Sequence, residues 1–158
     1  MAISLVLVLA FLIGVVCGLR SLTGPALVCW GAHLGWLHLA GSHLAFLASP
    51  ISLVVFSLLA VGELIADKFP KIPRRTTAAP LTARVLLGAM CGGAFAIAGG
   101  ATFGTSCLLG GLGGLIGAFA GYTARRVATF GGRLPDLPVA LFEDLIAVGG
   151  GLFLVSRF

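Results

Sequence analysis

Apolar residues gather in long stretches along this chain, and short connections that are more polar separate them. The stretches cover residues 3–19, 22–39, 45–67, 84–101, 105–124 and 137–156. A helix that crosses the hydrocarbon core of a bilayer needs about 20 predominantly apolar residues, and each stretch is close to that length. The pattern predicts an all-α, polytopic transmembrane helical bundle of about six spans, in one domain that covers residues 1–158.

The second stretch is the least regular of these. Gly24 and Pro25 lie at its start, and Ser49 and Pro50 interrupt the beginning of the third stretch. Proline cannot continue the hydrogen-bond ladder of a preceding helix. Residues 22–50 could therefore span fully or form two re-entrant half-helices, an arrangement that transporters use.

The basic residues occupy every second connection. They are Arg20 in the first, Lys68, Lys71, Arg74, Arg75 and Arg84 in and just after the third, and Arg125, Arg126 and Arg133 in the fifth. Only Arg157 lies elsewhere. Cytoplasmic loops are enriched in Lys and Arg, so these connections are expected inside and both termini outside. Basic residues at helix ends indicate membrane topology, and no nucleic-acid partner is expected.

Composition supports the bilayer as the main partner of the chain. Hydrophobic residue types make up 59% of it and charged types only 9%, with a mean hydropathy of +1.14. An ordinary soluble domain is about 25% charged. The sequence also lacks the nucleotide-binding, zinc-protease and nucleophile motifs of soluble enzymes, so no catalytic residue is predicted.

The five acidic residues fall into two groups. Glu63 and Asp67 lie four residues apart at the end of the third stretch, whereas Asp136, Glu143 and Asp144 begin the sixth. Both groups are expected at the same cytoplasmic depth if the connections alternate. A carboxylate within the membrane costs about 2.5–3.5 kcal/mol even on a lenient scale, which favours an acidic pocket over lipid exposure.

Four arginines near these acids are candidates for holding an anionic group. They are Arg20, Arg74, Arg75 and Arg84. Two interpretations are open. The charges could be interfacial anchors and structural ion pairs, or they could form a cytoplasm-facing pocket that binds a cation or proton and an anionic group. A cofactor is not identified beyond a possible cation at the acidic cluster, and the sequence does not define a metal site.

Glycine is abundant, with 24 residues, and recurs at four-residue spacing in the fifth stretch. The residues concerned are Gly110, Gly113, Gly114, Gly117 and Gly121. Small residues at this spacing form a glycine zipper that lets helix backbones approach closely. The partner helices could belong to the same molecule, or to a second copy in a homo-oligomer formed through this span.

Three segments carry a resemblance to a known family. They read GLRSLTGP at 18–25, GELIADKFPKIPRRT at 62–76 and LPDLPVALFEDLIA at 134–147. The chain resembles an uncharacterised family of small bacterial inner-membrane proteins, domain of unknown function 4126. The resemblance implies a multi-pass protein of the bacterial inner membrane and implies no activity.

The preferred hypothesis is a transporter- or channel-like protein for an ion, a small solute or a lipid. The alternatives are a membrane-embedded, Mg-dependent enzyme that acts on a phosphorylated lipid, and a structural or assembly subunit. The nearly uncharged outer half weakens the transport hypothesis. The lack of a catalytic motif weakens the enzyme hypothesis, so transport is favoured by a small margin.

Overall fold

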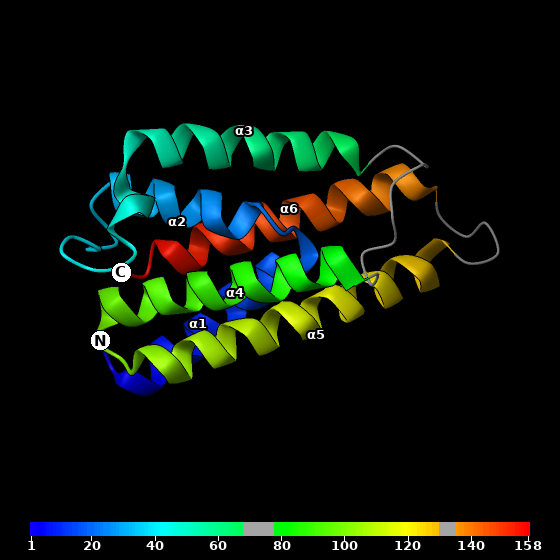
Figure 1. Ribbon diagram of the computed structural model, residues 1–158. Coiled ribbons are helices and arrows are strands. Elements are labelled where there is room, and N and C mark those ends of the chain that lie inside the picture. Colours follow the sequence, from blue (N-terminus) through cyan, green and yellow to red (C-terminus); the bar gives the residue numbers. More distant parts are fainter. Residues whose placement is uncertain (68–77, 130–134) are drawn as a thin grey trace.

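The computed structural model describes residues 1–67, 78–129 and 135–158, and these form α-helices without a β-strand (Figure 1). The helices are α1 (Ile3–Leu19), α2 (Thr23–His33), the short 3-10 helix η1 (Ala45–Ala48), α3 (Pro50–Ala66), α4 (Ala78–Gly99), α5 (Phe103–Thr129) and α6 (Asp136–Val155). The predicted all-helical class is confirmed.

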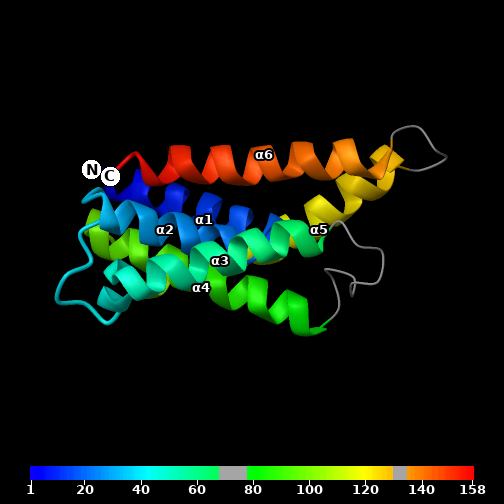
Figure 2. The ribbon, with the colours of Figure 1, turned by 90° about the horizontal axis from the view of Figure 1, so that it is seen from above.

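The helices run back and forth along one common direction, and both chain termini lie at the same end (Figures 1 and 2). We call this the terminal end and the opposite end the charged end. The last residues of α1, α3 and α5 and the first residues of α2, α4 and α6 lie toward the charged end. This placement brings alternate connections to the same end, as the charge pattern predicts.

Three helices in the described part of the chain, α4, α5 and α6, are long and apolar enough to cross a membrane. The helices α1 and α3 are apolar but shorter. Many large apolar side chains point outward, among them Ile51 and Leu58 on α3 and Leu145 on α6, each at least 67% exposed. Such a surface suits lipid. The exact number of spans and the side on which the termini lie stay predictions.

The expectation of one continuous second span over 22–39 was wrong. The helix α2 has only 11 residues and ends at His33. The chain then turns through Gly35, whose φ of 79° lies in the left-handed region that favours glycine. A pair of half-helices does not form either, because only the short η1 precedes α3. The Ser49 side chain accepts a hydrogen bond from the Ser52 N–H and begins α3 with Pro50 at its first turn.

The closest packing joins α5 to α1 and α4 through glycines. A Cβ added to Gly110 would overlap the carbonyl oxygen of Gly88 on α4, and one added to Gly14 on α1 would overlap that of Gly110. Gly113 and Gly117 meet the backbone of α1 in the same way, and Gly114 meets that of α4. These glycines therefore serve contacts within one molecule. A homo-oligomer through α5 stays a prediction.

The helix α3 is peripheral. It lies at the edge of the bundle (Figure 1), packs on α2 and η1, and Ala60 is its only buried residue. A hydrogen bond of 3.1 Å from Trp30 Nε1 to Ser57 Oγ adds one polar contact to α2. Little apolar packing therefore holds α3, which increases the importance of the charged residues near its end.

Candidate functional site

Arg20 is the centre of the site, in the turn between α1 and α2. Its backbone leaves the helical conformation (φ −138°, ψ 107°), while its N–H still bonds to the Val16 carbonyl oxygen at 2.8 Å. The guanidinium is 0% exposed. Its Nη1 lies 2.5 Å from Asp67 Oδ2 after α3, and its Nη2 lies 2.5 Å from Asp144 Oδ1 on α6. One buried cation thus joins two helices distant in sequence.

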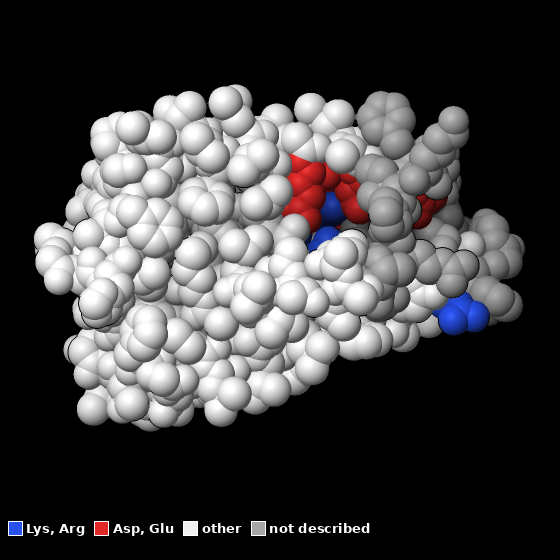
Figure 3. Space-filling view, viewed as in Figure 1, with Lys and Arg blue, Asp and Glu red and all other residues white. Residues whose placement is uncertain are grey.

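Arg125 on α5 extends this network. Its Nη1 donates to the same Asp67 Oδ2 at 2.9 Å, and its Nε and Nη2 bind both oxygens of Asp136 at 2.8 and 2.5 Å. Bidentate arginine–carboxylate pairs have a well-defined geometry. We call Arg20, Asp67, Arg125, Asp136 and Asp144 the charged cluster, in which acids and arginines alternate. Figure 3 shows acidic and basic atoms together in a hollow on this face of the molecule.

Glu63 lies one helical turn before Asp67 and binds the start of α2. Its Oε1 accepts hydrogen bonds from the Ser21 N–H at 2.8 Å and the Ser21 hydroxyl at 2.6 Å, and its Oε2 accepts one from the Leu22 N–H at 2.8 Å. The first N–H groups of a helix lack partners inside it and carry partial positive charge. The carboxylate satisfies both needs and links α3 to α2.

Arg84 on α4 performs the complementary task at the end of α1. Its Nη1 donates to the carbonyl oxygens of Gly18 and Leu19 at 2.6 and 2.8 Å, and its Nη2 lies 3.5 Å from Glu63 Oε1. The last carbonyl groups of a helix have no partner within it. Arg84 therefore stabilises the break between α1 and α2 from one side while Glu63 stabilises it from the other.

The first testable prediction concerns this break. Replacing Glu63 by Ala should destabilise the protein by about 1–2 kcal/mol, as the loss of a helix N-cap does. The amide hydrogens of Ser21 and Leu22 should also exchange faster. Glu63→Gln, which keeps one acceptor oxygen, is the matched control and should lose less. Hydrogen exchange in detergent checks this, and unchanged exchange at Ser21 and Leu22 in Glu63→Ala would contradict it.

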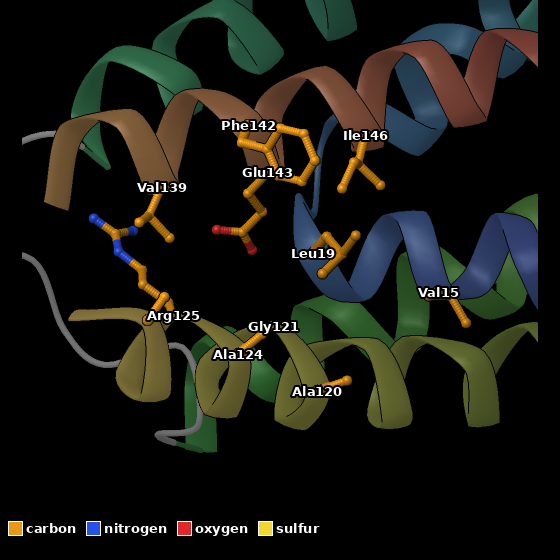
Figure 4. A pocket seen from close by; sticks show the side chains of 11 residues that line it. Val15, Leu19, Ala120, Gly121, Ala124, Arg125, Val139, Phe142, Glu143 and Ile146 are labelled. Carbon is orange, nitrogen blue, oxygen red and sulfur yellow. The ribbon is translucent and has the colours of Figure 1, made fainter. Parts of the chain in front are cut away.

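The neighbouring acids of α6 face different surroundings. Asp144 contacts Arg20, whereas the side chain of Glu143 points into a cleft between α1, α5 and α6 (Figure 4). The cleft has a volume of about 410 Å³. Among the described residues that line it, Glu143 and Arg125 are charged and the others are apolar. Glu143 is 9% exposed, so it lies beside the charged cluster but inside an apolar space.

The prediction that the two acidic segments meet at one end is confirmed, because Arg125 binds both Asp67 and Asp136. The structure also brings the predicted residues Arg20 and Asp144 into the cluster, and it places Glu63 and Arg84 directly beside it. Arg74 and Arg75 lie outside the described residues. A ligand-binding role for any of these residues stays a prediction.

Two residues of the site were not predicted. Ser21 belongs to the site because its N–H and hydroxyl donate hydrogen bonds to Glu63, a contact that the sequence does not reveal. Arg125 was predicted to be a loop residue because the fifth span was expected to end at residue 124. The helix α5 instead continues to Thr129. A usable signal did exist: Arg125 continues the four-residue spacing of Gly117 and Gly121, which places all three on nearly the same face of a helix.

A metal-binding arrangement is not found in the described ranges, where no group of three or more His, Cys, Asp or Glu residues could hold an ion. Asp67, Asp136 and Asp144 instead contact guanidinium groups, and Glu63 binds backbone N–H groups. A cation at the acidic cluster therefore gains no support from this part of the chain.

Comparison with known families now identifies the chain. The family model described as domain of unknown function (DUF4126) matches residues 7–156. The chain belongs to the DUF4126 family. The match covers the whole charged cluster and confirms the resemblance found from the sequence. No curated protein and no solved structure matches the chain. The function of this DUF4126 protein must accordingly be argued from its geometry.

Proposed function

We propose that this DUF4126 protein is a transporter-like membrane protein that binds an ion, a small solute or a lipid at the charged cluster. The observation that carries the proposal is the guanidinium of Arg20, fully buried between carboxylates of α3 and α6. We also propose that the charged end faces the cytoplasm of a bacterial inner membrane, because nine of the ten Lys and Arg residues lie, in the sequence, in or beside the first, third and fifth connections, and cytoplasmic connections are enriched in these residues.

Burying a charged side chain costs free energy. Desolvation of each ion costs several kcal/mol, and apolar residues of similar size often hold helices together at least as well. Ionisable residues inside a membrane protein usually mark a pathway for ions, protons or substrates. A network that joins Arg20 to two acids and Arg125 to two acids exceeds what anchoring a helix needs. This excess supports a binding role.

The peripheral position of α3 supports movement. Both Asp67 and Glu63 lie near the end of this helix, and apolar packing holds it weakly. An ion or proton that competes for Asp67 would weaken its pairs with Arg20 and Arg125. The end of α3 would then be released while α1, α4 and α5 stay together. A bistable element of this kind is what a transport cycle requires.

The close packing at the terminal end supports a transport cycle in which the solute enters from the charged end. Phe95 there is fully buried, and its ring centroid lies 4.7 Å from that of Phe158. Leu37 and Leu39 fill the space after α2 with no more than 2% exposure. A solute bound at the charged cluster would leave through the terminal end only after this packing changes.

A structural or assembly subunit is the second candidate. The direct pairing in the cluster, with Arg20 2.5 Å from both acids, favours it. The third candidate, a Mg-dependent enzyme acting on a phosphorylated lipid, gains no support from the described part of the chain, which offers no group of metal ligands.

A proton-flux experiment separates the first two candidates. The protein is reconstituted in liposomes that contain a pH-sensitive dye, and a potassium diffusion potential drives protons inward. We expect proton entry above that of protein-free liposomes, because we propose that the ion that competes with Arg20 and Arg125 for the cluster carboxylates is a proton. Asp144→Asn should reduce entry to the protein-free level.

Arg157→Gln is the control, since Arg157 is exposed at the terminal end, where its guanidinium lies over the Phe153 ring. It should leave proton entry unchanged. Proton entry at the protein-free level in the unmodified protein would contradict the proposal and favour the structural role.

A further inference from the structure

The cleft between α1, α5 and α6 has features that the transport proposal does not use. On α5 it is lined by small side chains, including Ala120, Gly121 and Ala124, and on α6 by Phe142 and Ile146. The small residues leave a furrow opposite the large ones (Figure 4). Its volume of about 410 Å³ lies in the range of small-molecule sites, about 300–1,000 Å³.

The cleft lies on a surface suited to lipid. Phe142 on α6 is 64% exposed, Leu141 next to it in sequence is 50% exposed, and Val127 on α5 is 61% exposed. An apolar furrow in such a surface offers water few polar partners. A hydrocarbon chain entering from the bilayer would cover the same apolar area without losing hydrogen bonds, so the chemistry of the lining favours an acyl chain.

Charge selects the headgroup of that lipid. Arg125 lines the charged end of the cleft, and the exposed Arg126 follows it in the last turn of α5. In the sequence, nine of the ten Lys and Arg residues lie in or beside the three connections that carry basic charge, one of which follows α5. Basic residues near a membrane surface attract anionic lipids. An acyl chain in the cleft would bring its phosphate toward Arg125 and Arg126.

We infer that the cleft between α1, α5 and α6 binds one anionic phospholipid, with an acyl chain along Ala124 and Phe142 and the headgroup at the end of α5. This inference concerns a site beside the charged cluster and does not depend on transport. The bound lipid would cover Glu143 from the bilayer side.

A second cleft, between α4 and α5, provides an internal comparison. It has a similar volume of about 440 Å³, and the described residues that line it, such as Val85, Cys107 and Leu112, are all uncharged. It offers a space for hydrocarbon but no group that distinguishes headgroups. Selectivity for an anionic lipid is therefore assigned to the first cleft alone.

The test measures retained lipid by native mass spectrometry of the full chain. The protein is equilibrated in mixed micelles with equal amounts of phosphatidylglycerol and phosphatidylcholine. We expect one retained phospholipid per protein and an excess of phosphatidylglycerol of about fivefold or more. Ala124→Leu, which fills the furrow from an exposed position, should abolish this retention. Ala83→Leu, at an exposed position of α4 outside the cleft, is the matched control and should retain the lipid.

A second variant tests the headgroup. Arg125→Gln should still retain a phospholipid but lose the preference for phosphatidylglycerol, and Arg126→Gln should reduce the preference without breaking an ion pair of the charged cluster. Equal retention of both lipids by the unmodified protein, or unchanged retention in Ala124→Leu, would overturn the inference. So would a lipid-free dimer that Ala124→Leu dissociates, because a second copy of the chain would then occupy the cleft.

Discussion

Replacing Arg20 by Met is expected to cause a large loss of stability, about 3–5 kcal/mol, which is the range for removing one partner from a buried charge network. The methionine fills much of the same volume, so the loss of stability comes more from the missing charge than from altered packing. Asp67 and Asp144 would lose the cation that lies 2.5 Å from each of them. Thermal unfolding of the detergent-solubilised protein measures the change.

A double-mutant cycle makes this prediction specific. The variant Arg20→Met with Asp144→Asn should be more stable than the sum of the single changes predicts, by about 1–3 kcal/mol, because the second change removes a carboxylate whose cation is absent. Arg157→Met is the control and should unfold close to the temperature of the unmodified protein. Additive effects, or normal unfolding of Arg20→Met, would show that the ion pairs of Arg20 contribute little.

Replacing Gly110 by Ala should also destabilise the bundle, by about 1–3 kcal/mol or more, as overpacking of a close contact does. The added methyl group would overlap the carbonyl oxygen of Gly88, and backbone cannot rotate away as a side chain can. Gly149→Ala on α6 is the matched control, since its Cβ would meet nothing within 4 Å. Alanine is intrinsically about 1 kcal/mol better than glycine within a helix, so the two substitutions should have opposite signs.

The measurement for this pair is thermal unfolding together with the oligomeric state in detergent. A less stable monomer in Gly110→Ala is expected, because the contact of Gly110 lies within the molecule. If the unmodified protein were a dimer and Gly110→Ala a stable monomer, this explanation would be contradicted. It would instead support the predicted homo-oligomer through α5.

Most of the helices could be predicted from the sequence because each depends on local composition. The predicted stretch 3–19 is the same as α1, and 137–156 differs from α6 by one residue at each end. The prediction was less accurate for α5, which extends five residues beyond residue 124 into a polar segment. A prediction from hydropathy ends a span at its first charged residues. In the structure the helix continues through Arg125, because Asp67 and Asp136 bind its guanidinium.

The second stretch illustrates a different limit. Its apolar composition over 22–39 predicted a span, but α2 ends at His33. Leu37 and Leu39 are apolar because they fill the core after the turn at Gly35, and they do not belong to a helix. Hydropathy reports burial and cannot distinguish a buried helix from a buried turn.

The sequence by itself determined that this chain is helical and membrane-like, that its basic residues alternate between connections, and that its two acidic segments meet at one end. Each of these properties follows from the order of the residues along the chain. The tertiary structure alone decided which acid pairs with which arginine, that Glu63 and Arg84 stabilise the break after α1, and that Glu143 enters a cleft while Asp144 binds Arg20. Those pairings depend on the rotation and relative height of each helix, which in α1, α4 and α5 are set by glycine contacts between residues as far apart in the chain as Gly14 and Gly110.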